Sequence, residues 1–338
     1  MENYAKYLSG GSVIVFKMES YSYELTSSDE GGTMNTRELE KIAKAARNLL
    51  LSQCEARLNF VLSHESDPIF AAEGAAIRQL KTAKRETLIE KAAYTWFNRF
   101  TAFRFMDVHG FNRPLVLSPA AEGGIQPQLL SDALEGITPK ELPAAEKKRV
   151  MDLLLGRIPS PNAQAEVYRL LFLNECKTLG RTLPFLFEEI DDPIRLLLPD
   201  DLLSEHSVPA LLRSVMDLSS CKDVEIIGWL FQFYISDKKD AVMAKGGAVS
   251  SEDLPARTQL FTPEWIVRYL VENSLGRLWM ENHPDSTLTQ HMRYYLKPPH
   301  AEDNSLLNPN SSLLTVEELK LLEIKVPRMI QFSDCLAA

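Results

Sequence analysis

The residues with the clearest chemical potential are Phe261, Thr262 and Pro263, which stand at the start of a predicted helix. Thr262 is a good N-cap, Pro263 suits the first helical position, and apolar residues then recur at helical spacing. The first turn of such a helix presents unpaired N–H groups and the positive end of a dipole, which attract anions. Taken alone, however, the segment favours an ordinary capped helix with a buried phenylalanine.

Other groupings of reactive side chains are weaker candidates. The acidic cluster at residues 188–192 favours an exposed turn bounded by proline, since no histidine or ordered set of carboxylates accompanies it. The six histidines are scattered and are expected at the surface. The four cysteines are far apart, which fits idle thiols in a reducing cytosol better than disulfides or zinc. Neither a metal site nor a nucleophile-and-base pair is predicted.

A dense run of aromatic residues with interleaved arginines extends from Tyr94 to Met106. Such a run can form a platform on which nucleic-acid bases stack. Aromatic residues at helical spacing more often form a core, with arginines extending from its edge, and we favour this interpretation.

The composition is that of an ordinary globular protein, with 45% hydrophobic and 25% charged residues. No apolar run is long enough for a membrane span, and no secretory signal is present, so we expect a cytoplasmic protein. The net charge of -9 argues against a free-standing DNA-binding protein. Only residues 37–104 are mildly basic, with twelve Lys/Arg against eight Asp/Glu, and a solvated helical face explains this excess.

Helical patterns dominate the chain from Met34 to about residue 250. The clearest predicted helices begin after Met34, at Ile77, at Ala144, at Glu166 and at Leu202. The segment 226–235 is ambiguous between strand and helix, and 238–253 is predicted as a polar loop. A short helix at 315–322 and the beginning of a strand at 323–326 are expected near the end.

Residues 1–33 differ from the rest, since they are rich in Gly, Ser and Tyr and contain one β-like run, Ser12–Phe16. They are interpreted either as a small hairpin or as an extension upstream of a true start at Met34. We favour the extension, because helix-capping chemistry begins at Asn35 or Thr36.

Four segments of the chain, in this order, resemble the PglX methyltransferases of type 1 phage-exclusion (BREX) systems. They are 94–106, 183–201, 228–240 and 259–280, and the resemblance extends from about Met34 to Val326. It implies a bacterial enzyme that uses S-adenosylmethionine to methylate N6 of adenine in double-stranded DNA, with other BREX proteins as possible partners. It also implies that Phe261, Thr262 and Pro263 bind the cofactor, with Phe261 packed against it and its carboxylate at the helix start.

Two motifs of this family are absent from the sequence, so no catalytic residue is assigned. One is the Gly-rich turn, Asp-Pro-x-x-Gly-Ser-Gly, that lets the backbone approach the cofactor. The other is Asn-Pro-Pro-Tyr, which orients an adenine swung out of the duplex. We therefore expect a truncated chain that is inactive by itself. A frameshift or premature stop is the favoured explanation, and a split gene is the alternative explanation. The alternative is a helical module that docks DNA or protein without catalysis.

The predicted fold class is a mainly α N-terminal domain followed by the truncated start of a Rossmann-like α/β methyltransferase domain. The expected boundaries are 1–33 for a possible non-native extension, 34–250 for the helical domain, 251–326 for the lead-in and first strand, and 327–338 for an aberrant tail. An incomplete sheet domain would leave apolar surface uncovered after residue 255.

Overall fold

The computed structural model divides the chain into two compact units, Met1–Asn35 and Thr36–Ala338, which are described separately. The residues that the structure describes are 4–9, 12–17, 36–121, 123–182, 187, 192–250, 253–258 and 260–297.

The first unit contains an antiparallel pair of strands, β1 (Tyr4–Ser9) and β2 (Ser12–Lys17). Tyr4 pairs with Lys17 at one end and Ser9 with Ser12 at the other, as in a hairpin with a short connection. This arrangement agrees with the hairpin interpretation of residues 1–33. Their status as a non-native extension stays a prediction.

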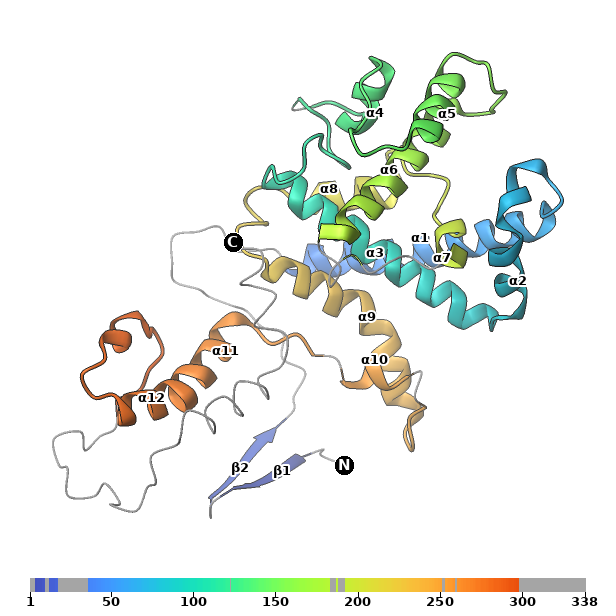
Figure 1. Ribbon diagram of the computed structural model, residues 1–338. Helices are drawn as coiled ribbons and strands as arrows, with labels where there is room; N and C mark the ends of the chain where they lie inside the picture. Colours follow the sequence, from blue (N-terminus) through green and yellow to red (C-terminus); the bar gives the residue numbers. More distant parts are fainter. Residues whose placement is uncertain are drawn as a thin grey trace, which may run out of the picture. The chain divides into compact units, whose positions relative to one another are not determined.

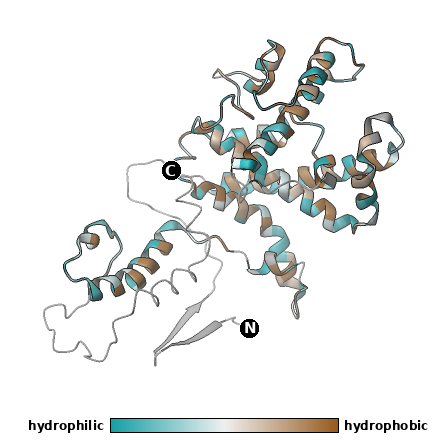
Figure 2. Ribbon diagram, in the orientation of Figure 1, coloured by the Kyte–Doolittle hydropathy of each residue, from teal (hydrophilic) through white to brown (hydrophobic). Residues whose placement is uncertain are grey.

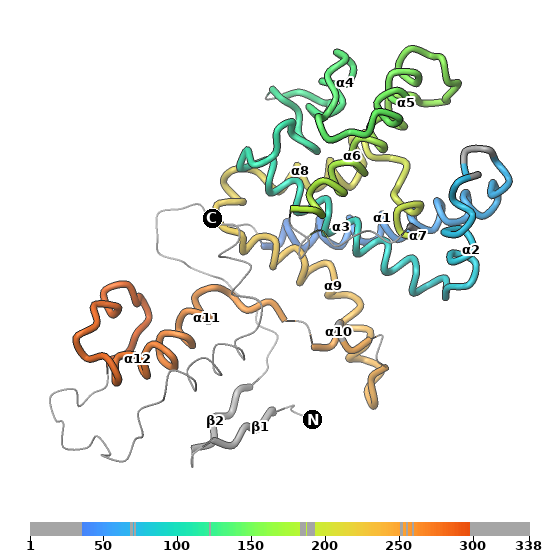
Figure 3. Tube along the Cα trace, viewed as in Figure 1, coloured from blue at the N-terminus to red at the C-terminus, as the bar shows by residue number. Residues whose placement is uncertain are grey.

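The regular secondary structure of the second unit is helical in its described residues, with turns and loops between the helices (Figures 1 and 3). Its helices are α1 (Thr36–Ser63), α2 (Gly74–Thr82), α3 (Arg85–Val108), α4 (Gln128–Leu134), α5 (Ala144–Leu154), α6 (Ala163–Thr182), α7 (Asp192–Leu196), α8 (Val208–Val215), α9 (Glu225–Lys245), α10 (Leu254–Thr258), α11 (Glu264–Val271) and α12 (Arg277–Asn282). Two 3₁₀ segments, η1 (Pro68–Glu73) and η3 (Thr287–His291), and a π-helical turn, η2 (Glu272–Gly276), complete the series.

Helix α3 is the centre of the core, and α1, α8 and α9 pack against it. Its fully buried side chains include Trp96, Phe97, Phe100 and Phe103. The ring of Phe103 lies 5.3 Å from Phe172 of α6, between ring centroids, and Arg99 lies over a further buried ring. The core interpretation of the aromatic run is therefore confirmed.

Helix α9 resolves the ambiguous segment, because residues 226–235 are helical rather than extended. The loop predicted from Lys238 is wrong in its first half, since the helix continues to Lys245. The polar residues of this part are good helix formers, and the helix ends only at Gly246, whose φ of 62° lies in the left-handed region.

Several other predicted helices are confirmed, namely α1 after Met34, α5 from Ala144 and α6 around Glu166. The helix predicted near Leu202 is shorter than expected, because α8 begins only after its N-cap Ser207. The helix at 315–322 and the strand at 323–326 lie outside the described residues. The mainly helical fold is thus confirmed, whereas the Rossmann-like sheet is not shown.

Hydropathy mapped on the ribbon shows apolar positions alternating with polar ones along most helices (Figure 2). Within the described part of the chain, no helix combines the length and apolar character that crossing a membrane requires. Cys54, Cys176 and Cys221 are buried free thiols, as predicted, and burial raises the pKa of Cys54 and Cys176 to about 12.

Candidate functional site

Of the three residues implied in cofactor binding, Phe261 packs against helix α9. The ring of Phe261 packs directly over Gly228 of α9, where a methyl group in place of the glycine hydrogen would overlap it. Trp229 completes the contact edge-to-face, at 5.3 Å between ring centroids. The absence of a side chain at Gly228 is therefore what lets Phe261 approach the helix.

Two polar side chains of α9 fix the backbone of the same segment. Gln232 Oε1 accepts a hydrogen bond from the Phe261 N–H at 3.0 Å, and Glu225 Oε1 accepts one from the Glu264 N–H at 3.2 Å. Glu225, Gly228 and Gln232 are spaced by three and four residues, so they share one face of α9. This face positions both the aromatic ring and the start of α11.

The start of α11 differs from the prediction. Its N-cap is Pro263, with φ of -54° and ψ of 146°, and the first helical residue is Glu264. Thr262 is therefore not the N-cap, and the N-cap residue of α11 makes no side-chain capping hydrogen bond. The physical reason is tertiary: Glu225 of α9 supplies the oxygen that a local cap would otherwise provide.

Glu225 also changes the electrostatics of this helix start. Burial raises the pKa of its carboxyl above the usual range, the hydrogen bond from the Glu264 N–H opposes this, and the nearby carboxylates of Glu264 and Asp223 reinforce it. An acidic group of the protein thus occupies the donor at which the cofactor carboxylate was expected. A second carboxylate at the same place would be repelled.

After α11 the chain passes through η2 and α12 and folds back on itself. Glu272 is buried and accepts the Tyr294 N–H at 2.5 Å. Asn273 donates to the carbonyl of Tyr294 at 2.8 Å and accepts the Leu296 N–H at 2.8 Å. These bonds hold residues 294–296 against the π-helical turn, a local irregularity that often marks a functional position.

Large apolar side chains of this region remain exposed. Trp265 is 44% exposed, Leu270 57% and Trp279 40%. In the described stretch 260–297, only Glu272 and Gly276 are buried. The expectation of uncovered apolar surface after residue 255 agrees with this pattern.

Sequence reasoning found the Phe261 segment and missed its partners on α9. The signal that could have identified them was Gly228 itself, because a glycine inside an apolar helix commonly marks a close approach by another group. The acidic segment 188–192 was predicted as a turn rather than a metal site. Residues 188–191 lie outside the described residues, and the described part of the chain contains no cluster of potential metal ligands.

The chain was compared with known proteins and with protein-family models. No family model matches the chain. It is 40% identical over 244 residues to the adenine-specific methyltransferase BrxX of Escherichia coli O9:H4 (strain HS), which covers 71% of this chain and 19% of that protein. It is 39% identical over 197 residues to the adenine-specific methyltransferase PglX of Lacticaseibacillus casei (strain Zhang), which covers 57% of this chain and 16% of that protein.

Both relatives are named as adenine-specific methyltransferases, so the chain is similar to part of an enzyme of that class. The match to part of BrxX and of PglX agrees with the resemblance that the sequence motifs indicated. The chain spans less than a fifth of the length of these curated relatives.

Proposed function

We propose that the chain is the helical part of a DNA methyltransferase that transfers a methyl group from S-adenosylmethionine to N6 of adenine in double-stranded DNA. The enzyme would act in the bacterial cytoplasm as part of a type 1 BREX phage-exclusion system. The names of the two relatives support the reaction class. The observation that carries the proposal is the fixed position of the Phe261 segment on α9, which gives a motif of this family a defined location.

Phe261, Thr262 and Pro263 remain the residues proposed to contact the cofactor, which supplies the electrophilic methyl group when bound. They fit only part of the role implied by the resemblance. The Thr262 hydroxyl is half-buried and does not cap α11, so it is available to a ligand. Pro263 holds the backbone extended before the helix. The helix start does not fit a cofactor carboxylate while Glu225 occupies it, so we place the contact at Phe261 and Thr262 instead.

The exposed apolar side chains Trp265, Leu270 and Trp279 are proposed to contact a Rossmann-like methyltransferase domain. Exposed apolar side chains of this size favour burial against another folded surface. The Gly-rich turn and the Asn-Pro-Pro-Tyr segment do not occur among the 338 residues. We therefore expect the chain by itself to be unable to methylate DNA.

The test is a chimera in which this chain replaces the matching part of the Escherichia coli relative. We expect cells that carry the chimera to contain N6-methyladenine at one sequence context in long-read sequencing. Phe261→Ala should raise the KM for S-adenosylmethionine with little change in kcat, because it removes a binding contact. A chimera that unfolds cooperatively and yet leaves DNA unmethylated would contradict the proposed function.

A second candidate function is a docking module without catalysis, which binds DNA or other exclusion-system proteins. The observation that favours it is the exposure of the same large apolar side chains, because such side chains also serve protein–protein contact. The chimera separates the two: a docking module would leave the KM for S-adenosylmethionine unchanged when Phe261 is replaced.

A further inference from the structure

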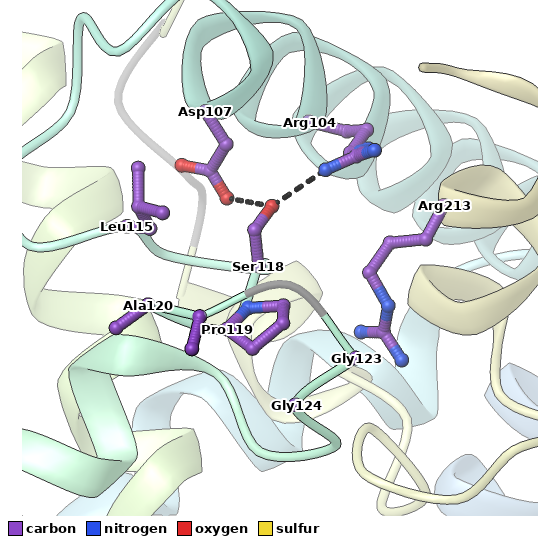
Figure 4. Close-up of a pocket in the computed structure, with 10 residues that line it drawn as sticks. Arg104, Asp107, Leu115, Ser118, Pro119, Ala120, Gly123, Gly124 and Arg213 are labelled. Atoms are coloured by element: carbon purple, nitrogen blue, oxygen red, sulfur yellow. Dashed lines mark hydrogen bonds between the residues drawn. The ribbon is translucent and has the colours of Figure 1, made fainter.

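A pocket of about 380 Å³ lies beside the C-terminal part of α3, away from the Phe261 segment in the sequence (Figure 4). Its lining includes Arg104 of α3, Arg213 of α8 and the loop that carries Ser118, Gly123 and Gly124. Two guanidinium groups from different helices therefore face one cavity. The sequence contains no phosphate-binding loop pattern here, so only the structure brings these residues together.

The wall of the pocket is fixed by Asp107, whose carboxylate is fully occupied. Oδ1 accepts the Asn112 side-chain amide at 2.9 Å and the Val116 N–H at 2.9 Å. Oδ2 accepts the Leu117 N–H at 2.7 Å and the Ser118 hydroxyl at 2.8 Å. Four donors saturate this carboxylate, so it orders the loop rather than pairing with a guanidinium group.

The two arginines, in contrast, use few of their donors. Arg104 Nη1 donates to the Ser118 hydroxyl at 2.8 Å, and Arg213 Nη1 donates to the Leu117 carbonyl at 2.9 Å. Arg104 Nε is buried and has no hydrogen-bond partner among the described residues. Neither arginine forms an ion pair within the part of the chain that the structure describes. The Asp107 carboxylate in the pocket wall partly offsets the burial of both charges, and Asp217 adds to this at Arg104. Among the described residues, neither carboxylate accepts a hydrogen bond from these guanidinium groups, which leaves donors for a ligand.

We propose that Arg104 and Arg213 together bind a phosphate group in this pocket. A guanidinium group presents parallel N–H donors that match two oxygens of one phosphate, and two such groups surround it. Bound phosphate would also offset the cost of burial, which lowers the pKa of both arginines. The site stands independently of the methyl-transfer proposal.

The loop on the other side of the pocket needs glycine at two positions. Gly123 has φ of 80°, a conformation that other residues adopt only with strain. A Cβ on Gly124 would lie 2.7 Å from the Pro119 Cβ, so a larger residue would push this turn apart. Gly124 thus allows the loop to pack closely against Pro119. Glu122, between them, lies outside the described residues.

The experiment is an NMR titration of the ¹⁵N-labelled chain with inorganic phosphate, at ionic strength matched with sodium chloride. We expect saturable shifts of the Arg104 and Arg213 Nε–H signals, assigned by their loss in Arg104→Lys and Arg213→Lys. Arg213→Lys keeps the charge and removes the paired donors, so phosphate affinity should fall at least about tenfold. Arg149→Gln, an exposed arginine of α5 that pairs with Glu166, is the matched control and should change nothing.

A second arm distinguishes the sources of the phosphate. If a short DNA duplex displaces inorganic phosphate and shifts the same two signals, the ligand is the DNA backbone. If phosphate and adenosine monophosphate bind but the duplex does not, the ligand is a small phosphorylated molecule. Shifts in the wild-type chain that never saturate, or that chloride reproduces, would overturn the proposal even if Arg213→Lys fails to fold.

Discussion

The environment of α3 and the stretch from α11 to α12 differ in how their apolar residues are used. In α3 the large rings of Trp96, Phe97 and Phe103 are almost completely buried. In the later stretch Trp265 and Trp279 keep 44% and 40% of their surface exposed. The first region is stabilised by its own core, whereas the second is attached to α9 by one aromatic ring and two hydrogen bonds. The difference supports the proposal that the second region packs against a further surface.

The largest expected effect is at the core of the first region. Phe103→Ala removes a ring that packs 5.1 Å from Phe187 and 5.3 Å from Phe172. We expect the free energy of unfolding to fall by about 3–5 kcal/mol. Urea denaturation followed by circular dichroism measures this. Trp265→Ser is the matched control and should change stability by less than about 0.5 kcal/mol; equal effects of the two variants would remove the distinction between the regions.

A smaller loss is expected at the polar network that orders residues 116–118. Asp107→Asn replaces one carboxylate oxygen by an NH₂ group, which donates hydrogen bonds and cannot accept them. The two donors that now bond to that oxygen would lose their acceptor. We expect a loss of about 2–3 kcal/mol in the same assay. Ser118→Ala removes one of the four hydrogen bonds to Asp107 and the one from Arg104, and should cost about 1 kcal/mol. If Asp107→Asn is as mild as Ser118→Ala, the network does not stabilise the loop as described.

Gly228→Ala tests how the second region is attached to α9. Glycine to alanine inside a helix ordinarily stabilises it by about 0.5–1 kcal/mol, but here the methyl group would displace the ring of Phe261. We expect faster amide hydrogen exchange over residues 260–271, with α3 unaffected. In a Phe261→Ala background the same substitution should become stabilising. Unchanged exchange in Gly228→Ala would show that Phe261 does not anchor the segment.

The smallest effect is a pH dependence at Glu225. Because burial raises its folded-state pKa, the ionised form costs stability at neutral pH. That cost disappears as pH falls through the folded-state pKa toward the ordinary glutamate value of about 4.3. Glu225→Gln keeps an oxygen that accepts the Glu264 N–H and should stabilise the chain by a few tenths of a kcal/mol at pH 7, after solvent screening. The stabilisation by Glu225→Gln should vanish near pH 4. A lower free energy of unfolding of this variant at pH 7 would show that the ionised carboxylate stabilises the fold.

The sequence predicted the first region well and the second only in outline. Apolar spacing in α3 determines which side chains face the core, so the burial of Trp96 and Phe103 followed from the pattern alone. The start of α11 did not follow, because Glu225, thirty-nine positions earlier in the chain, replaces the local cap expected from Thr262. The pocket between Arg104 and Arg213 was equally hidden, since its two cations are brought together only by the packing of α3 and α8.

The central claim is that this chain holds Phe261 and Thr262 in place but supplies only part of a cofactor site. Isothermal titration calorimetry of the 338-residue chain with S-adenosylmethionine tests it most directly. The account predicts no detectable heat of binding, because one aromatic ring and one hydroxyl give too little affinity without the Gly-rich turn. Micromolar or tighter binding, lost in Phe261→Ala, would contradict it and show a complete site within these residues.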